Sequence, residues 1–385
     1  MRRVIFPFID DGHPFSADVE RLRSQLRVAG QPQLDGRRVV LSEIRGRRLD
    51  GGGFVLDRCY CSMQHWSEVG YEFDATSWYY RAGDVDSPRI YHFPDEPYLT
   101  ALAPYLASRD LDRPDGGLDV LRYVPLRRFT FRAPRRDRTG GAEIGKFKRP
   151  SRLHESYGRT TAVAAAVRST ASSFAVATPA GLDVEHAIYF QDDIAGTDLA
   201  TAAEGDPRAL EVTAQVLAAF HAVPSPTLTM LDESRFHNSL GRDLEWITFH
   251  APALADVVDR ATRALRDPPA LESSVLAHGD FVPSHVLRGD HQLTVIDLDL
   301  AHRGDRYRDV AIMLASLPID APAASTETTA IIDAYEERAG LHLEPRRLAW
   351  HRVAAEAYYL ALAFTKDRPI DAAPLTKAVN ELEAV

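Results

Sequence analysis

The sequence has few cysteines and no long apolar run. Its 385 residues include two cysteines, Cys59 and Cys61, which form one CxC pair and are too few and too close for a disulfide framework. With His65 as the one nearby additional ligand, a metal site there is not predicted. No stretch approaches 18 consecutive apolar residues, and the N-terminal apolar run is short and interrupted by acids. We therefore expect a soluble, cytoplasmic protein that does not bind membranes.

Lysine is also scarce, and the overall charge is negative. Lys and Arg together number 45 against 55 Asp and Glu, for a net charge of −10, and lysine contributes four of the 45. A chain this acidic is a poor nucleic-acid binder, so we predict no nucleic-acid partner. Residues 121–152 are the exception, with eleven Lys and Arg against two acids, a local +9 that leaves −19 for the rest. A phosphate-bearing ligand is expected at this basic segment.

The order of the predicted elements indicates an α+β protein with three parts. Residues 1–115 alternate strand-like segments with two amphipathic helices, at 17–30 and 96–108, and form an N-terminal α+β module. Residues 116–192 carry β-rich segments and one helix near 151–171, and are predicted to form a small lobe. Residues 193–385 show mostly helical spacing and are predicted to form a larger helical lobe.

Two short β segments inside the helical lobe hold the acids and histidines that carry chemistry. The first contains His278-Gly279-Asp280 and ends at His285, and the second reads Ile296-Asp297-Leu298-Asp299. A carboxylate at the end of an apolar strand is costly unless it meets a cation, a metal or a substrate hydroxyl. Phosphoryl transfer needs one carboxylate for the attacking hydroxyl and others for Mg²⁺ on the nucleotide phosphates. The sequence has no Gly-rich phosphate loop of the usual spacing.

These motifs together resemble the aminoglycoside phosphotransferase and choline kinase type of small-molecule kinase, relatives of the protein kinases. The resemblance covers roughly residues 118–340 and rests on HGDFVPSH, IDLD, the RGDRYRDVA that follows, the lysine strand IGKFKR and the helix end at FHAVP. It implies a bilobal protein-kinase-like fold, with a β-rich N-lobe and a helical C-lobe, preceded here by the N-terminal module. It also implies ATP or another nucleoside triphosphate as donor, Mg²⁺ as cofactor and a small-molecule hydroxyl as acceptor.

The resemblance assigns roles to individual residues. It makes Asp280 the catalytic base, Asp297 the principal Mg²⁺ ligand, and Lys146, in preference to Lys148, the contact of the α- and β-phosphates. It pairs Lys146 with Glu155 of the following helix. The segment Phe190–Asp193 becomes the hinge, so the remaining nucleotide-binding residues are Gln191, Asp192 and Asp193.

Independently of the resemblance, three arginines of the first hairpin, Arg122, Arg127 and Arg128, are candidates to clamp phosphate oxygens, the alternative being a solvated basic strand face.

One position departs from the family pattern. The family has Asn at the fifth residue after the catalytic Asp, where this sequence has His285. A neutral imidazole is a poor ligand for Mg²⁺, which prefers oxygen. Three explanations stay open: His285 holds the catalytic loop by hydrogen bonds, Asp299 supplies the missing metal ligand, or one metal suffices. With His285 itself kept as a third metal candidate, the predicted metal set is Asp297, Asp299 and His285.

The leading hypothesis is an ATP-dependent phosphotransferase that acts on a hydroxyl of an antibiotic, another natural product or a sugar. The alternative is a nucleotide-binding pseudokinase with a regulatory role, favoured by His285 and opposed by the joint presence of Asp280, Asp297 and Lys146. The sequence contains no pattern that predicts an oligomeric state.

Overall fold

The computed structural model describes most of the chain from residue 37 onward. The described residues are 37–48, 54–67, 70–72, 76–81, 89–92, 94–95, 98–108, 119–124, 128–135, 141–224, 228–270, 274–320, 328–365 and 371–385. The helix predicted at 17–30 and the candidate Arg127 lie outside these residues.

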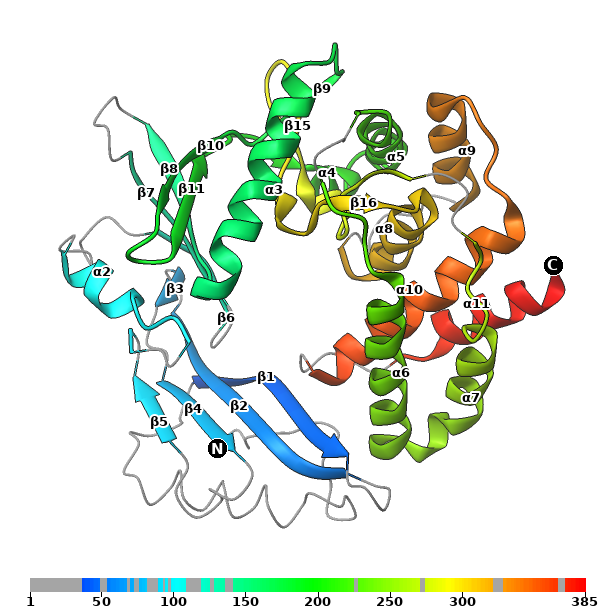
Figure 1. Cartoon of the computed structure of the whole chain (residues 1–385), viewed down its shortest axis with the longest axis horizontal. Coiled ribbons are helices and arrows are strands. Elements are labelled where there is room, and N and C mark those ends of the chain that lie inside the picture. The colour runs from blue at the N-terminus through cyan, green and yellow to red at the C-terminus, as the bar shows by residue number, and fades with distance from the viewer. Residues whose placement is uncertain are drawn as a thin grey trace.

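An antiparallel sheet comes first in the chain. Its strands are β1 (Arg37–Arg48), β2 (Phe54–Ser67), β3 (Gly70–Glu72), β4 (Thr76–Arg81) and β5 (Arg89–His92). They pair in the order β1-β2-β4-β5, with β3 on β2. Cys59 and Cys61 both lie on β2. Figure 1 shows this sheet below the second one, in the blue part of the chain.

The second sheet has five antiparallel strands in the order β10-β11-β8-β7-β6. They are β6 (Asp119–Val124), β7 (Arg128–Pro134), β8 (Ala142–Phe147), β10 (Pro179–Asp183) and β11 (Ile188–Asp192). Phe129, Phe131, Phe147 and Phe190 are fully buried between this sheet and α2 (Leu102–Ser108). Burial of each such ring stabilises the lobe by about 2 kcal/mol. The β-rich segments predicted within residues 116–192 are thus present.

Close packing explains why residue 145 on β8 is a glycine. A Cβ at this position would lie 2.3 Å from the ring of Phe131 on the neighbouring strand β7. Only glycine fits this close approach. The glycine one residue before Lys146 therefore lets the aromatic core press against the strand that carries the lysines.

A long helix, α3 (Pro150–Arg168), follows β8 and lies beside the second sheet. Pro150 opens it, and its buried positions Leu153, Ser156, Thr160, Val163 and Val167 recur at helical spacing. The far side of α3 contacts η3 (Leu298–Leu300) of the helical lobe. The helix therefore links the two lobes.

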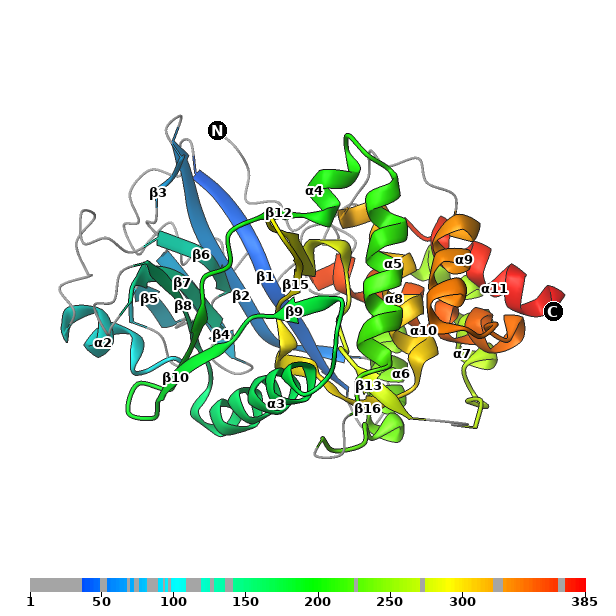
Figure 2. The same cartoon turned by 90° about the horizontal axis from the view of Figure 1, so that it is seen from above.

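The rest of the chain forms a helical lobe around a small polar hairpin. Its helices are α4 (Leu199–Ala203), α5 (Arg208–His221), α6 (Glu233–His250), α7 (Ala255–Ala264), α8 (Arg306–Asp320), α9 (Thr328–Ala339), α10 (Pro345–Thr365) and α11 (Ala373–Ala384). Figure 2 shows strands gathered at one end of the molecule and these helices at the other. Leu210, Ala214, Leu217 and Phe220 place α5 at the centre of the core.

The polar hairpin contributes short strands to two small sheets. One sheet has the order β12-β14-β15-β9, formed by β12 (Thr197–Asp198), β14 (Val286–Arg288), β15 (Leu293–Val295) and β9 (Phe174–Val176). The other pairs β13 (Val275–Ala277) with β16 (His302–Gly304). The predicted β segments around Asp280 and Asp297 are present, and both motifs follow directly after a strand.

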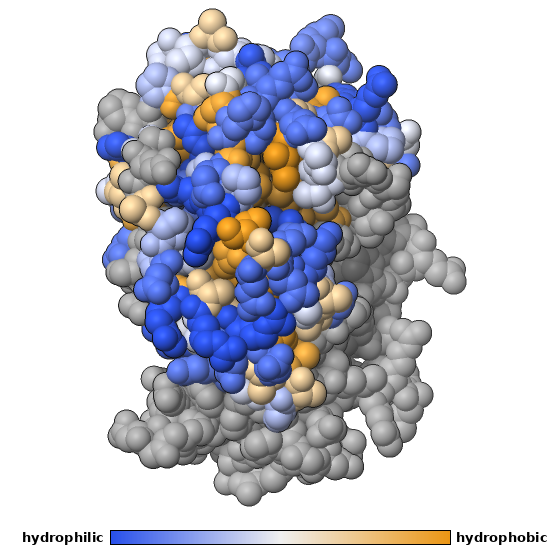
Figure 3. Space-filling model, turned by 90° about the vertical axis from the view of Figure 1, so that its right-hand side faces the viewer, coloured by the Kyte–Doolittle hydropathy of each residue, from blue (hydrophilic) through white to orange (hydrophobic). Residues whose placement is uncertain are grey.

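The predicted α+β class and its two lobes, β-rich and helical, are confirmed. Helices α6, α8 and α11 all lie in the part of the chain predicted to be the helical lobe. In the structure α2, assigned by the sequence to the N-terminal module, packs against the second sheet; the boundaries at 115 and 192 stay predictions. Figure 3 shows a mainly hydrophilic face of the helical end, with hydrophobic residues in small separate patches. Within the described ranges no helix is long and apolar enough to cross a membrane.

Candidate active site

The loop that carries Asp280 is fixed by a buried carboxylate. The backbone N–H groups of His278 and Gly279 donate to the two oxygens of Asp309 on α8, at 2.6 and 2.9 Å. Gly279 has φ +85°, and a Cβ there would lie 2.7 Å from the carbonyl oxygen of Leu300. A glycine is therefore required between the histidine and Asp280. The HGD motif needs its middle residue because the loop turns in the left-handed region against η3.

His278 supports this loop from below. Its Nε2 donates to the carbonyl of Ile296 at 2.9 Å, and its ring stacks on that of His285 at 5.7 Å. Burial, with a smaller electrostatic contribution from the nearby His285, lowers the pKa of His278. A buried ring that binds backbone in this way is a structural element and not a base.

His285 connects the two acidic motifs. Its Nδ1 donates to the carbonyl oxygen of Asp280 at 2.9 Å, and its Nε2 lies 3.6 Å from Oδ2 of Asp297. Of the three explanations for this residue, the geometry supports the first, a hydrogen bond that holds the catalytic loop. Through His285 the Asp280 loop and the Asp297 carboxylate form one site.

Asp297 lies at the end of β15 among positive charges. It is one of two described non-glycine residues with positive φ, at +62°, a conformation that aspartate tolerates better than most residues. Nζ of Lys146 donates to its Oδ1 at 2.9 Å, and Nη1 of Arg128 lies 3.5 Å from its Oδ2. Burial opposes the charge of Asp297, but the attraction of Lys146 outweighs it and holds the pKa of Asp297 well below its usual value.

Asp299 is held by a different pair of side chains. It accepts hydrogen bonds from Nζ of Lys148 and from the hydroxyl of Tyr189, and it is 7% exposed. Burial opposes its charge, but Lys146 and Lys148 lower its pKa. Because Lys148 and Tyr189 occupy both of its oxygens, the geometry disfavours Asp299 as the substitute metal ligand that the sequence allowed.

Lys146 on β8 and Lys148, just after the strand's end, point to the same side, as alternation predicts. Both ammonium groups lie near the ring of Tyr189, at 5.6 and 5.8 Å from its centre. Burial alone would lower the pKa of Lys146, but Asp297 raises it above its ordinary value. For Lys148 burial dominates and the pKa is lowered. Lys146 is therefore the lysine whose protonated form the site stabilises more strongly. This agrees with the prediction that Lys146, rather than Lys148, contacts the phosphates.

The predicted pair between Lys146 and Glu155 is wrong for this structure. Glu155 is bound instead by Nη1 of Arg152 at 2.8 Å and by Nη2 of Arg159 at 2.6 Å, both on α3. The hydrogen bond from Arg152 lowers its pKa. Arg159 then donates to the carbonyl of Asp299 at 3.1 Å. The physical reason is helix phase: the position of Glu155 on α3 faces the arginines, and Lys146 already has Asp297.

The predicted hinge residues lie at the end of β11. Gln191 is buried, Asp192 is bound by Arg135 at 2.7 Å, and Asp193 by Arg132 at 2.9 Å. The two carboxylates are therefore engaged with arginines on and after β7, and contact with adenine through the backbone stays a prediction. Three further residues, Arg132, Tyr189 and Arg159, belong to no motif of the sequence. They come close to the site only on folding, across strands and between lobes.

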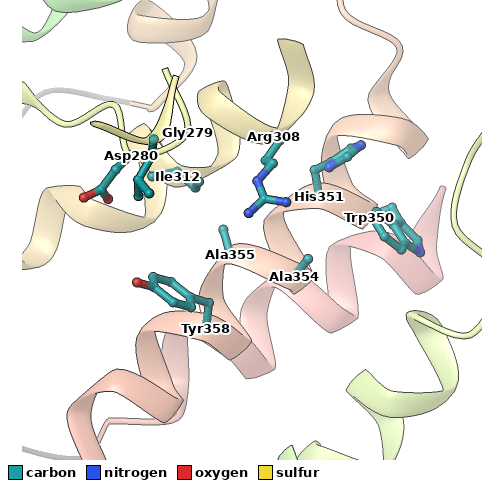
Figure 4. A pocket seen from close by; sticks show the side chains of 10 residues that line it. Gly279, Asp280, Arg308, Ile312, Trp350, His351, Ala354, Ala355 and Tyr358 are labelled. Atoms are coloured by element: carbon teal, nitrogen blue, oxygen red, sulfur yellow. The ribbon is translucent and has the colours of Figure 1, made fainter. Parts of the chain in front are cut away.

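Two hollows adjoin the Asp280 loop. The first, the α8–α10 pocket, measures about 210 Å³ and is lined by Gly279, Asp280, Leu300, Arg308, Ile312, Trp350, His351, Ala354, Ala355 and Tyr358. Figure 4 shows Asp280 at one end, Trp350 at the other and the Arg308 guanidinium between them. The second, the α3 pocket, measures about 380 Å³ and is lined by Arg152, Glu155, Arg159, Thr229, Met230, Leu231, Asp232, Gly279, Leu300, His302 and Arg308. Gly279, Leu300 and Arg308 separate the two.

The fit to a magnesium ion can be tested on Asp297. Within the described part of the chain no three His, Cys, Asp or Glu residues are grouped so as to hold a metal. Mg²⁺ on a nucleotide needs only one or two carboxylates, because phosphates and water supply the other ligands. The Asp297 carboxylate contacts two cationic groups, at 2.9 and 3.5 Å, and a metal would take their place while they bind phosphate oxygens. The residues thus fit a metal held by Asp297 and phosphate, not a site built from protein ligands alone.

A β-rich lobe and a helical lobe, with paired lysines and acids between them, form a protein-kinase-like fold. Residues 125–354 match the model of the phosphotransferase enzyme family. The chain belongs to this family, as the motifs predicted, and membership indicates an ATP-dependent phosphotransferase that acts on small molecules.

Similar folds occur among solved structures. A choline/ethanolamine kinase family protein from Mesorhizobium loti is 14% identical, with 73% of this chain and 92% of that chain covered and a TM-score of 0.49. An aminoglycoside phosphotransferase from Streptomyces rimosus is 18% identical, with 66% and 98% covered and a TM-score of 0.48. A macrolide 2'-phosphotransferase type I is 19% identical, with 74% and 96% covered and a TM-score of 0.48. No curated protein shows a significant match. The family assignment is therefore carried by the match over residues 125–354.

Proposed function

We propose that this protein transfers the γ-phosphoryl group of ATP to a hydroxyl of a small molecule, with Asp280 as the catalytic base. One observation carries the proposal: Asp280 lines the α8–α10 pocket, and His285 joins its loop to Asp297, which faces Lys146 and Arg128. A hydroxyl in the pocket and phosphates at the cations would then meet at Asp280.

The reaction follows from these positions. The acceptor oxygen attacks the γ-phosphorus, a new P–O bond forms, and the bond from that phosphorus to the β–γ bridging oxygen breaks. The carboxylate of Asp280 orients the hydroxyl and takes its proton, and ADP leaves with the bridging oxygen. General-base catalysis of this kind contributes about 10²- to 10⁴-fold to the rate.

The cationic groups at Asp297 bind the donor. Lys146 reaches the α- and β-phosphates, and Arg128 approaches the same region from the first hairpin strand of the lobe. Lysine suits this task because its flexible point charge serves phosphate and carboxylate together. Bound with the nucleotide and held by Asp297, Mg²⁺ would neutralise charge on the phosphate oxygens. Lys148 and Asp299 hold β8 against η3 and are positioning residues.

A pseudokinase is the second candidate, because His285 stands where the family has a metal-binding Asn. Such a protein would bind ATP without turnover. The presence of a base at Asp280, with its loop fixed by Asp309, favours the enzyme, since a binding module has no need of a base.

The decisive experiment measures ADP release from ATP with and without Mg²⁺, over a panel of hydroxyl compounds. We expect turnover by the wild type that Asp280→Asn reduces at least about 100-fold, with nucleotide binding retained. Asp290→Asn is the matched control, since Asp290 is exposed in the turn after β14. Wild-type protein that binds ATP but neither hydrolyses it nor phosphorylates any acceptor would favour the pseudokinase.

A further inference from the structure

The α8–α10 pocket has an apolar lining with small side chains at its centre. Ile312 of α8 and Trp350, Ala354 and Ala355 of α10 are each at most 6% exposed. The consecutive alanines leave the hollow open, because larger side chains there would fill it. Its volume of about 210 Å³ is below the 300–1,000 Å³ typical of drug-sized ligands, so it holds one ring and not a whole multi-ring molecule.

The charges around this pocket are few and balanced. Among its described lining residues Asp280 is the one carboxylate and Arg308 the one arginine. Arg308 lies between Asp280 and Trp350 (Figure 4), on the path along the pocket. An ammonium group moved from water into this lining would meet apolar side chains and a like charge, and would lose hydration with one carboxylate to offset it.

The neighbouring α3 pocket does not change this balance. It adds Arg152 and Arg159 against Glu155 and Asp232, and Glu155 is already bound by both of those arginines. A polycation that reached from one hollow into the other would find no surplus of carboxylates among the described residues.

From these observations we infer that the acceptor is an uncharged hydroxyl compound with an apolar ring, and not a polycationic aminosugar. The ring packs on the surface formed by Ile312, Trp350, Ala354 and Ala355, and the hydroxyl points to Asp280. The inference deepens the proposed function and rests on it for the role of the pocket. Leu300 lines both hollows and is 51% exposed, so a charge introduced there would act on a ligand in the pocket.

The test compares two ligands that differ by one charge, phenyl β-D-glucopyranoside and its 4-(aminomethyl)phenyl counterpart. Binding is measured by ligand-observed NMR on the full chain, and needs no phosphoryl transfer. We expect the neutral glucoside to bind at least about tenfold more tightly, equal to ~1.4 kcal/mol. Leu300→Glu should narrow this ratio at least about threefold by adding a carboxylate at the mouth, and its exposure keeps the fold intact.

Val184→Glu is the matched control, because Val184 is 58% exposed in the β10–β11 connection and should leave the ratio unchanged. A neutral glucoside that binds no more tightly than the amine, or not at all, overturns the inference, and so does a Leu300→Glu ratio equal to that of Val184→Glu. Failure of the proposed function looks different: the neutral glucoside binds preferentially, while ATP is not turned over with any acceptor.

Discussion

The two sides of Asp280 are built from opposite materials. On the β8 side, Lys146, Lys148, Asp297 and Asp299 form two buried ion pairs around Tyr189. On the α10 side, the hollow is lined mainly by aliphatic and aromatic carbon. One side handles its ligand by charge and the other by shape.

This difference matches the two ligands of the proposed reaction. A triphosphate has the same charges whichever acceptor is used, so a fixed set of cations and acids serves it. An acceptor is chosen by the size and polarity of the pocket wall, which helices α8 and α10 can vary without disturbing the charged cluster. The predictions below test each side of this contrast.

The largest expected effect is on the charged side, at Asp297. Asp297→Ala should weaken Mg²⁺-dependent ATP binding at least about 100-fold, equal to ~2.7 kcal/mol, by calorimetric titration. ATP binding without metal should stay or tighten, because Lys146 and Arg128 lose the carboxylate that they now share. Asp290→Ala is the control. Unchanged Mg²⁺ dependence in Asp297→Ala would remove the metal role from this residue.

The second prediction concerns the ion pair between Lys148 and Asp299. Lys148→Met and Asp299→Asn should each lower the free energy of unfolding by about 2 kcal/mol, since each leaves a buried polar group with fewer partners. The double variant should cost clearly less than the sum, as measured by urea denaturation. A second double-mutant cycle on the exposed pair Arg152–Glu155 is the control. The interaction energy between these two side chains should be about 0.5 kcal/mol. Additive losses at Lys148 and Asp299 would contradict the pairing.

The helix that lines the apolar side predicts a pH effect. Burial raises the pKa of Glu356 on α10 to about 7, and Arg352 only partly offsets it. The folded protein therefore binds more protons than the unfolded chain between about pH 4.5 and pH 7, and stability falls as the pH rises through that range.

Glu356→Gln should therefore stabilise the protein at pH 8 by at least about 1 kcal/mol and change little at pH 4.5, as thermal melts at several pH values would show. Glu337→Gln, on the exposed face of α9, is the control. A gain that is the same at both pH values would mean that ionisation of Glu356 does not cause it.

Much of the fold was readable from the sequence, because strand alternation and helical spacing are local properties. The aromatic strands around Pro125, the helix after β8 and the two acidic hairpin segments are all where their patterns place them. Helices α6 and α8 are hard to recognise in the sequence, also for local reasons. Helix α6 contains Gly241 and several polar residues, and the start of α8 lies inside the RGDRYRDVA motif.

The partners within the site were less predictable, because they depend on long-range geometry. Strand alternation would put Asp297 and Asp299 on the same side, but the chain leaves the strand at Asp297, where φ is +62°, and Asp299 turns toward Tyr189. Tyr189 faces Lys146 only through the register of β11 on β8. The predicted pair of Glu155 with Lys146 was wrong because the sequence alone defines the phase of a helix only to within a residue or two.

The smallest expected effect is at His285, where the two sides meet. An asparagine amide can donate to the Asp280 carbonyl as Nδ1 of His285 does at 2.9 Å, so His285→Asn should keep ATP turnover within about threefold of the wild type or raise it. His285→Ala removes the donor and should lower kcat while leaving nucleotide binding by the Lys146 cluster intact. Steady-state kinetics and calorimetry on both variants separate these effects. If His285→Asn loses activity as fully as His285→Ala, the imidazole has a function that a hydrogen bond to the loop does not supply, and the contrast between a charged side and an apolar side would need a third element at their junction.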